Sequence, residues 1–265
     1  MMDMTAFYPL PDEKPLDRLV TDGGFCRIFR SIACVGDSLS SGEFEGTDAE
    51  GNKTYHDMFE YSWGQYMARA AGCLVRNFSR GGMTAKEYCE TFADANGFFD
   101  ASLACSAYIL ALGVNDVSSG IPLGSTADIK ADWRENEKTF AGYYGAIVQR
   151  YKAFRPDAKF FFMTMPRESG MTADRAAKYD AHRELLYALA EHFDNAYVLD
   201  LRAYAPVYDE QFRRHFYLGG HLNPAGYALT AEMVMSYIDY LVRHHPRDFA
   251  QVGFIGTPHK NTVDL

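Results

Sequence analysis

Five short apolar runs, spaced along the chain with helical patterns between them, constrain the fold more than any other feature of this sequence. Each run is four to six residues long and rich in β-branched or aromatic residues, which favours a buried strand over a helix. Strands of this kind that alternate with helices are typical of a parallel sheet with crossover connections. The predicted strands are Ile32–Val35, Leu74–Phe78, Tyr108–Leu112, Lys159–Thr164 and Ala196–Leu199.

The helical patterns complete an α/β architecture. We predict a three-layer α/β/α sandwich around a doubly wound, flavodoxin-like parallel sheet of five strands. No internal repeat or linker marks a second domain, so residues 1–265 are predicted to form one domain with a core at about 31–243. The N- and C-terminal extensions are expected to pack on the sandwich. The sequence does not decide whether they also form contacts in a homo-oligomer. The predicted helices are Trp63–Ala71, Ala85–Ala95, Asn136–Phe154, Ala173–Phe193 and Pro224–Val242.

Composition and charge narrow the function classes. A net charge of -9 argues against nucleic acid and anionic membranes as partners, because both attract basic patches. The five cysteines include no CxxC pair, so the sequence predicts neither a disulfide framework nor a zinc site. The N-terminus lacks the cationic and apolar regions of a secretory signal, and no apolar run reaches transmembrane length. The expected location is therefore the cytoplasm.

Polar residues follow two predicted strands and precede one predicted helix. Gly-Asp-Ser-Leu at 36–39 places Ser38 just after the first strand, and Gly-Val-Asn-Asp at 113–116 places Asn115 just after the third. The carboxyl ends of parallel strands are where ligands and reacting groups gather in open α/β sheets. His221 lies two residues before Asn223-Pro224, a strong signal for the start of a helix.

These segments, in this order, resemble the SGNH (GDSL-type) hydrolase family from about residue 32 to about residue 240. The resemblance implies that Ser38 is the nucleophile and that His221 is the general base and acid. It also implies an oxyanion hole made by the Ser38 N–H, a glycine N–H and the Asn115 amide. The family pattern places that glycine two residues before a Thr, which selects Gly82, with Gly81 as the fallback.

Elementary chemistry agrees with these roles. A serine hydroxyl becomes a good nucleophile when a neutral imidazole takes its proton, and acyl transfer needs hydrogen-bond donors aimed at the developing oxyanion. The reaction requires no metal and no organic cofactor. Each residue taken alone also has a purely structural explanation. Asn115 could cap a turn, and Gly82 could simply supply a left-handed backbone conformation.

The family pattern departs at the residue that orients the histidine. An Asp three residues before the His is expected, but that position holds Leu218. The sequence leaves three explanations open: a backbone carbonyl near Leu218, within residues 216–219, a carboxylate from elsewhere, or an impaired site. The nearest candidate acids are Asp209 and Glu210, and Asp200 ends the last predicted strand; none has the expected spacing.

Two long connections are expected to shape the substrate site. Residues 40–61 and 117–132 are read as loops without regular structure, and the aromatic residues of the first are expected either to cover the site or to pack the loop down. Arg167 and Glu168 are expected at the same sheet edge, within reach of substrate.

The sequence therefore predicts a serine esterase that removes a short acyl group, such as O-acetyl, from a small molecule or carbohydrate. A lipase or lysophospholipase, and a non-catalytic ligand-binding protein of the same fold, are the alternatives.

Overall fold

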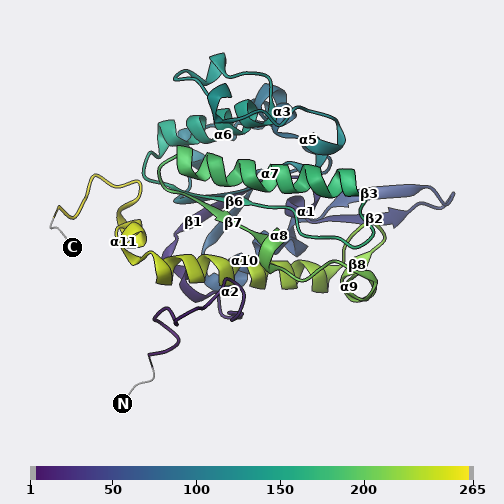
Figure 1. The fold of residues 1–265 in the computed structure, drawn as a ribbon, viewed down its shortest axis with the longest axis horizontal. Helices are drawn as coiled ribbons and strands as arrows, with labels where there is room; N and C mark the ends of the chain where they lie inside the picture. Colours follow the sequence, from purple (N-terminus) through teal and green to yellow (C-terminus); the bar gives the residue numbers. More distant parts are fainter. Residues whose placement is uncertain (1–3, 263–265) are drawn as a thin grey trace.

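The structure, a computed structural model, describes residues 4–262 and confirms the predicted α/β sandwich. Five parallel strands form the central sheet in the order β4-β1-β5-β6-β7 (Figure 1). This order reverses direction between β1 and β5, which makes their carboxyl ends the place where such folds bind ligands. The strands are β1 (Ser31–Gly36), β4 (Leu74–Asn77), β5 (Ala107–Ala111), β6 (Lys159–Met163) and β7 (Ala196–Leu199).

Alternate residues of each strand feed two separate cores. In β1, Ala33 and Val35 face one layer while Ile32 and Cys34 face the other, as the two-residue period of a strand requires. Figure 1 shows α3, α6 and α7 above the sheet and α2 and α10 below it. The first layer contains α3 (Ala85–Glu87), α4 (Ala93–Ala95), α6 (Phe140–Phe154) and α7 (Ala173–His192); the second contains α2 (Trp63–Ala71), α10 (Pro224–His244) and α11 (Pro246–Phe249).

Two helices differ in detail from the sequence prediction. The predicted helix Ala85–Ala95 is continuous but carries a π-helical turn over Tyr88–Phe92, between α3 and α4. The helix predicted from residue 136 begins instead at Phe140, because the Thr139 side chain accepts a hydrogen bond from the Gly142 N–H and caps it there. Shorter helices lie in the connections: α1 (Ser38–Ser41), α5 (Val114–Ser118), α8 (Leu201–Tyr204) and α9 (Glu210–Phe216).

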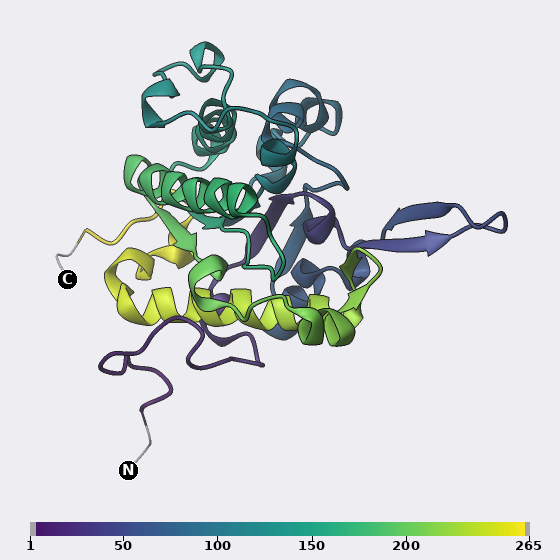
Figure 2. The same cartoon turned by 45° about the vertical axis from the view of Figure 1, so that its right-hand side comes forward.

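The connection 40–61 is not the irregular loop that the sequence predicts. It forms an antiparallel hairpin of β2 (Glu43–Thr47) and β3 (Lys53–Asp57), and Figure 2 shows this hairpin projecting away from the sandwich. The prediction fails because both strands are polar and only partly buried, so they lack the apolar alternation by which a strand is recognised. Phe44 packs at the base of the hairpin against Tyr61 and Tyr227. Tyr55, by contrast, lies edge-on to the His221 ring, with the ring centroids 6.1 Å apart. The aromatic residues thus divide between packing the hairpin down and contacting the histidine.

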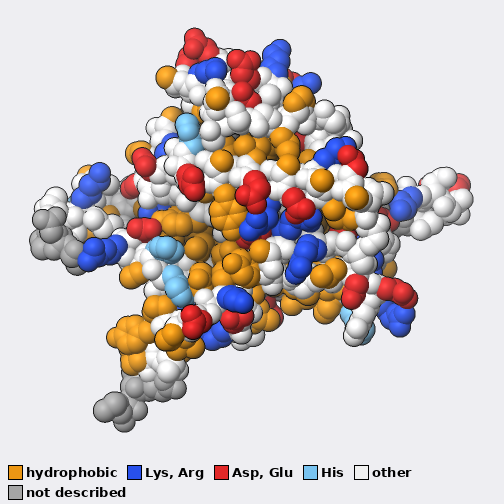
Figure 3. Space-filling view, viewed as in Figure 1, with side chains coloured by type: hydrophobic (Ala, Val, Ile, Leu, Met, Phe, Trp, Pro, Cys, Tyr) orange, Lys and Arg blue, Asp and Glu red, His pale blue; other side chains and the backbone are white. Residues whose placement is uncertain are grey.

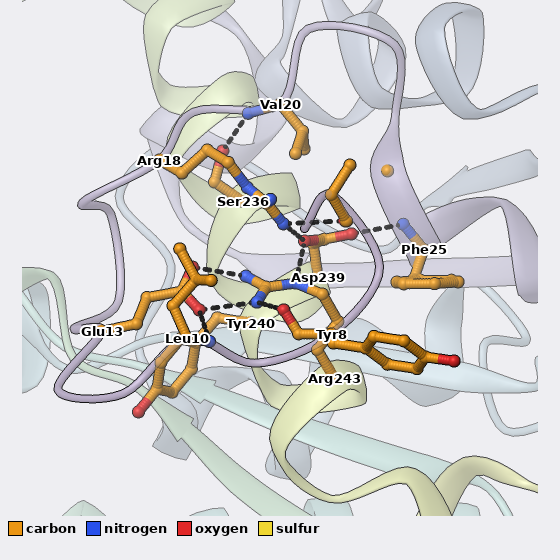
Figure 4. Close-up of polar contacts among 12 residues, drawn as sticks. Tyr8, Leu10, Glu13, Arg18, Val20, Phe25, Ser236, Asp239, Tyr240 and Arg243 are labelled. Atoms are coloured by element: carbon orange, nitrogen blue, oxygen red, sulfur yellow. Dashed lines mark hydrogen bonds and ion pairs between the residues drawn. The ribbon is translucent and has the colours of Figure 1, made fainter. Parts of the chain in front are cut away.

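The N-terminal extension packs on α10 as expected. Arg243, buried in α10, forms a bidentate ion pair with Glu13 and a second ion pair with Asp239, and the Val20 N–H donates to Ser236 Oγ (Figure 4). Residues 4–28 are called the N-terminal strap below. In the space-filling view, hydrophobic side chains gather beside the N-terminal end of the chain (Figure 3). The exposed apolar residues of the N-terminal strap are Met4, Phe7, Tyr8, Leu10 and Leu19.

The C-terminal extension also packs on the sandwich, where Phe249, Val252 and Ile255 join the core on the α10 side of the sheet. Within residues 4–262 no helix is both long and apolar enough to cross a membrane. The cytoplasmic location stays a prediction.

Candidate active site

Ser38 lies at the first position of α1, directly after β1. The Asp37 side chain caps this short helix by accepting a hydrogen bond from the Leu39 N–H at 3.2 Å. The chain turns so tightly here that a Cβ on Gly36 would overlap the Ser40 side chain, which explains why residue 36 is a glycine. Within the described part of the chain, the Ser38 N–H has no hydrogen-bond partner. The turn therefore presents a hydroxyl and a free N–H at the sheet edge.

Gly82, in the loop after β4, presents a second free N–H. Its φ of 72° is left-handed, and a Cβ built on it would meet only open space. No acceptor among residues 4–262 takes its N–H. Gly81, the fallback, differs: its N–H donates to Asp57 Oδ2 at 3.4 Å, and a Cβ there would overlap the Glu43 carboxylate. The geometry supports Gly82 over Gly81 for a role as a donor.

Asn115 connects the Ser38 turn with the Gly82 loop. It lies in α5, directly after β5, and its Nδ2 donates to the Met83 carbonyl at 3.0 Å and to Asp37 Oδ2 at 3.4 Å. Its neighbour Asp116 is buried and accepts the Ala85 N–H with both carboxylate oxygens, at 3.0 and 3.1 Å. The structure thus brings the three predicted donor positions to one edge of the sheet, around the end of β1.

Two buried carboxyl groups lie under this site. Burial raises the pKa of Asp37 to about 7, and the nearby charges of Asp116 and Glu43 act in the same direction. Burial also raises the pKa of Asp116 to about 6, against the opposing effect of the Ala85 N–H. Within residues 4–262 no group of three or more His, Cys, Asp and Glu side chains is arranged to hold a metal ion.

His221 lies on the two-residue strand β9 (His221–Leu222), immediately before α10. The Asn223 side chain accepts the Gly226 N–H at 2.9 Å and Pro224 occupies the first turn, so the helix start that the sequence indicates is confirmed. Strand β9 pairs with β8 (Tyr217–Leu218) and packs against both α1 and β2. In the described part of the chain no hydrogen bond joins the imidazole to the Ser38 hydroxyl.

The imidazole is held between two carboxylates of the hairpin. Nδ1 of His221 lies 3.0 Å from Glu45 Oε1, and Nε2 lies 3.1 Å from Glu43 Oε1. The ion pair of Glu45 with Lys53, at 2.7 Å, lowers the pKa of the Glu45 carboxyl, with His221 and the Gly220 N–H as smaller contributors. The imidazole therefore has an acid at each nitrogen.

Neither Asp209 nor Glu210 contacts His221, so the suggestion that one of them orients it is wrong. Asp209 caps α9 by accepting the Phe212 N–H at 2.8 Å, and Glu210 forms an exposed ion pair with Arg214 at 3.0 Å. Both carboxylates are thus engaged by their own helix.

The backbone-carbonyl explanation is also wrong, because the Nδ1 partner is a side chain. Leu218, which is 53% exposed, lies opposite His221 in the β8–β9 pair. Glu45 escaped the sequence prediction because it lies 176 residues before the histidine, although Glu43 and Glu45 alternate as two residues on one face of a strand would.

A small cavity of about 80 Å³ lies beside the Ser38 turn. Glu168 lines it and pairs with Arg213 at 2.7 Å, whereas Arg167 is exposed outside it. Its apolar lining comes from Leu39, Val114, Met163, Met165, Pro166 and the rings of Tyr179, Tyr208 and Tyr217.

Comparison with known proteins identifies the family and supports the fold. The family model described as "GDSL-like Lipase/Acylhydrolase family" matches residues 34–229. No curated protein matches the sequence. Among solved structures, a family two carbohydrate esterase from Clostridium thermocellum in complex with cellohexaose is 17% identical, with a TM-score of 0.54. That match covers 86% of this chain and 66% of that one.

Two further solved structures share the fold. A family 3 carbohydrate esterase from Clostridium thermocellum is 14% identical with a TM-score of 0.51, over 81% of this chain and 97% of that one. A protein assigned to the G-D-S-L family of lipolytic proteins, from Desulfitobacterium hafniense, is 18% identical with a TM-score of 0.52, over 78% and 99%. At these identities the structures support the fold alone, whereas the family model matches residues 34–229, most of the sequence, including Ser38, Asn115 and His221. The chain therefore belongs to the GDSL-like lipase/acylhydrolase family.

Proposed function

We propose that this protein is a serine esterase that removes a short acyl group, such as acetyl, from a small molecule or carbohydrate. The observation that carries the proposal is the convergence of Ser38 and the free N–H groups of Ser38 and Gly82 at one edge of the sheet, beside the Asn115 amide. A substrate oxygen would replace the longer of the two Asn115 contacts, the one to Asp37 at 3.4 Å. Donors placed around a nucleophile are what the oxyanion of acyl transfer requires.

The proposed reaction has two acyl-transfer steps. The Ser38 oxygen attacks the ester carbonyl while its proton passes to Nε2 of His221. The tetrahedral intermediate then expels the alcohol, which takes that proton, and the acyl group stays on Ser38. Water, deprotonated by the same imidazole, attacks the acyl-enzyme, and the serine oxygen leaves with the proton as the carboxylic acid is released. No external oxidant or cofactor enters this balance.

The size of the cavity beside Ser38 favours a short acyl group. Its volume of about 80 Å³ is small beside the roughly 300–1,000 Å³ of typical small-molecule pockets. The cavity is lined mostly by apolar side chains, among them Leu39 and Met163, so it suits a methyl or ethyl group rather than a long chain. The carbohydrate esterases that share the fold make an acetylated sugar the first substrate to try.

Hydrolysis of p-nitrophenyl esters from acetate to laurate, alongside acetylated sugars, tests this function. We expect acetate to be cleaved faster than laurate; the reverse order would favour the lipase alternative. Ser38→Ala is expected to lower kcat by about 10⁴-fold or more without changing thermal unfolding. Covalent labelling by an organophosphonate should require Ser38. Labelling of another serine, or an active Ser38→Ala variant, would reject the proposal.

A further inference from the structure

Each nitrogen of His221 faces a carboxylate oxygen, and this arrangement is inconsistent with direct action as a base. A nitrogen–oxygen contact near 3 Å requires one shared proton, so the two contacts require two protons. An imidazole whose Nε2 is engaged in this way cannot also accept the proton of Ser38. For His221 to act as a base, the carboxylate at Nε2 must therefore move away from the imidazole, while the carboxylate at Nδ1 keeps its contact.

Glu45 is the carboxylate that is fixed in its contact with the imidazole. Its side chain is 9% exposed, and one oxygen accepts from both His221 Nδ1 and the Gly220 N–H, at 3.0 and 2.9 Å. Its other oxygen pairs with Lys53 at 2.7 Å. Hydrogen bonds to both oxygens hold the group ionised and fix its orientation. Nδ1 consequently carries the proton, which is the tautomer that leaves Nε2 free to act as a base.

Glu43 is in a different environment. It is 12% exposed, and the only hydrogen-bond partner of its carboxylate within residues 4–262 is Nε2 of His221. The group packs against Gly81, next to the proposed oxyanion donor, so it occupies the side of the imidazole where a nucleophile and substrate would act. Burial raises its pKa; His221 opposes this shift, while Asp57 and Glu45 add to it.

We infer that the hairpin supplies the acid that the family pattern places before the histidine: Glu45 is the positioning residue for His221. Its neighbour on the same strand face, Glu43, is a resting-state partner of Nε2 that leaves as Ser38 takes its place. This inference rests on the proposed esterase function. The acid that orients His221 therefore lies on a projecting hairpin, more than a hundred residues before the position in the loop preceding α10 where the family pattern places it.

The two carboxylates should then have opposite effects on activity. Loss of Glu45 frees the imidazole to adopt the wrong tautomer and removes the charge that stabilises the imidazolium during acyl transfer. Loss of Glu43 removes a competitor for Nε2, so activity should rise. The charged and titratable groups that face this cluster are Lys53, Tyr55 and Asp57 of β3, Asp37 of the Ser38 turn and Tyr227 of α10.

The test compares Glu45→Ala with Glu43→Ala, two identical truncations on one strand face, in the full-length protein with p-nitrophenyl acetate. We expect Glu45→Ala to lower kcat by about 10³-fold with little change in KM. Added formate, a small carboxylate, should restore part of that loss. Glu43→Ala should instead raise kcat/KM and gain nothing from formate. The exposed Glu50→Ala, at the hairpin tip, serves as the unchanged control.

Further variants separate this inference from its alternatives. Lys53→Met, which removes the partner of Glu45 but keeps the carboxylate, should cost about tenfold in kcat. It also serves as the second variant if Glu45→Ala does not fold. Asp209→Asn and Glu210→Gln should each cost less than about tenfold.

The inference is overturned if Glu45→Ala keeps kcat within tenfold of the parent while Ser38→Ala is inactive, or if Glu43→Ala falls as far as Glu45→Ala. An active Ser38→Ala variant would instead reject the esterase function itself.

Discussion

Replacement of Arg243 by Met should detach the N-terminal strap from α10. The side chain is 2% exposed and makes three short charge-assisted contacts: 2.6 and 2.8 Å to the oxygens of Glu13, and 2.8 Å to Asp239. Removal of one partner from a buried ion pair costs about 3–5 kcal/mol, because the remaining charge loses its compensation. Asp239 would keep the Phe25 N–H at 2.9 Å and the more distant Arg18 at 3.5 Å.

We expect the lower end of that range, about 3 kcal/mol, because Glu13 lies on a strap that can turn its carboxylate to water. At roughly 2–4 °C per kcal/mol for a chain of this size class, Tm should fall by about 6–12 °C. Calorimetry measures this shift, and amide exchange should show faster exchange in the strap than in the sheet. Arg247→Met, an exposed replacement in α11, is the control. A Tm within 2 °C of the parent, or an equal loss in the control, would refute the reasoning.

Three more predictions concern the site. Asn115→Ala should lower kcat by about 10²–10³-fold with little change in KM, as expected for a transition-state donor; an effect on KM alone in steady-state assays would make it a ground-state contact. Gly82→Ala should fold with about 1–2 kcal/mol less stability, the cost of a left-handed alanine, yet lose most activity because its Cβ enters the open space at the donor. Asp37→Asn should flatten the pH dependence of urea unfolding: the pKa of Asp37 is raised from 3.8 to about 7, so its stabilising contribution is complete below pH 3.8 and is lost as pH rises through 7. Between pH 5 and 8 that loss is at most about 3 kcal/mol, and an unchanged slope in the variant would contradict it.

Much of the fold could be read from local patterns. The strands of the sheet are buried on both faces, so their short apolar runs stand out, and β7 (Ala196–Leu199) has the predicted bounds. Capping residues also predicted where a helix begins when one side chain forms the cap, as Asn223 does at the start of α10. The hairpin could not be recognised in this way because its polar strands are held together mainly by backbone pairing.

The site was only partly readable for a related reason. Ser38, Asn115 and His221 follow or precede regular elements, and the fold rules therefore place them at one sheet edge. Glu45 reaches the histidine across 176 residues of sequence, and no local rule relates the two. Acidic residues are common on exposed strands, so Glu45 becomes distinctive only when the three-dimensional arrangement shows what it contacts.

The spread of the site along the chain bears on how the protein is made. Ser38 and the hairpin lie near the start, whereas His221 precedes α10 near the end. After Ser38 the ribosome must add a further 183 residues (221 − 38) before His221, the proposed base, is present in the chain. Every nascent chain shorter than this carries Ser38 without an activating imidazole. The separation of these two residues along the chain therefore delays the proposed activity until the segment that carries His221 has been synthesised and folded against the Ser38 turn.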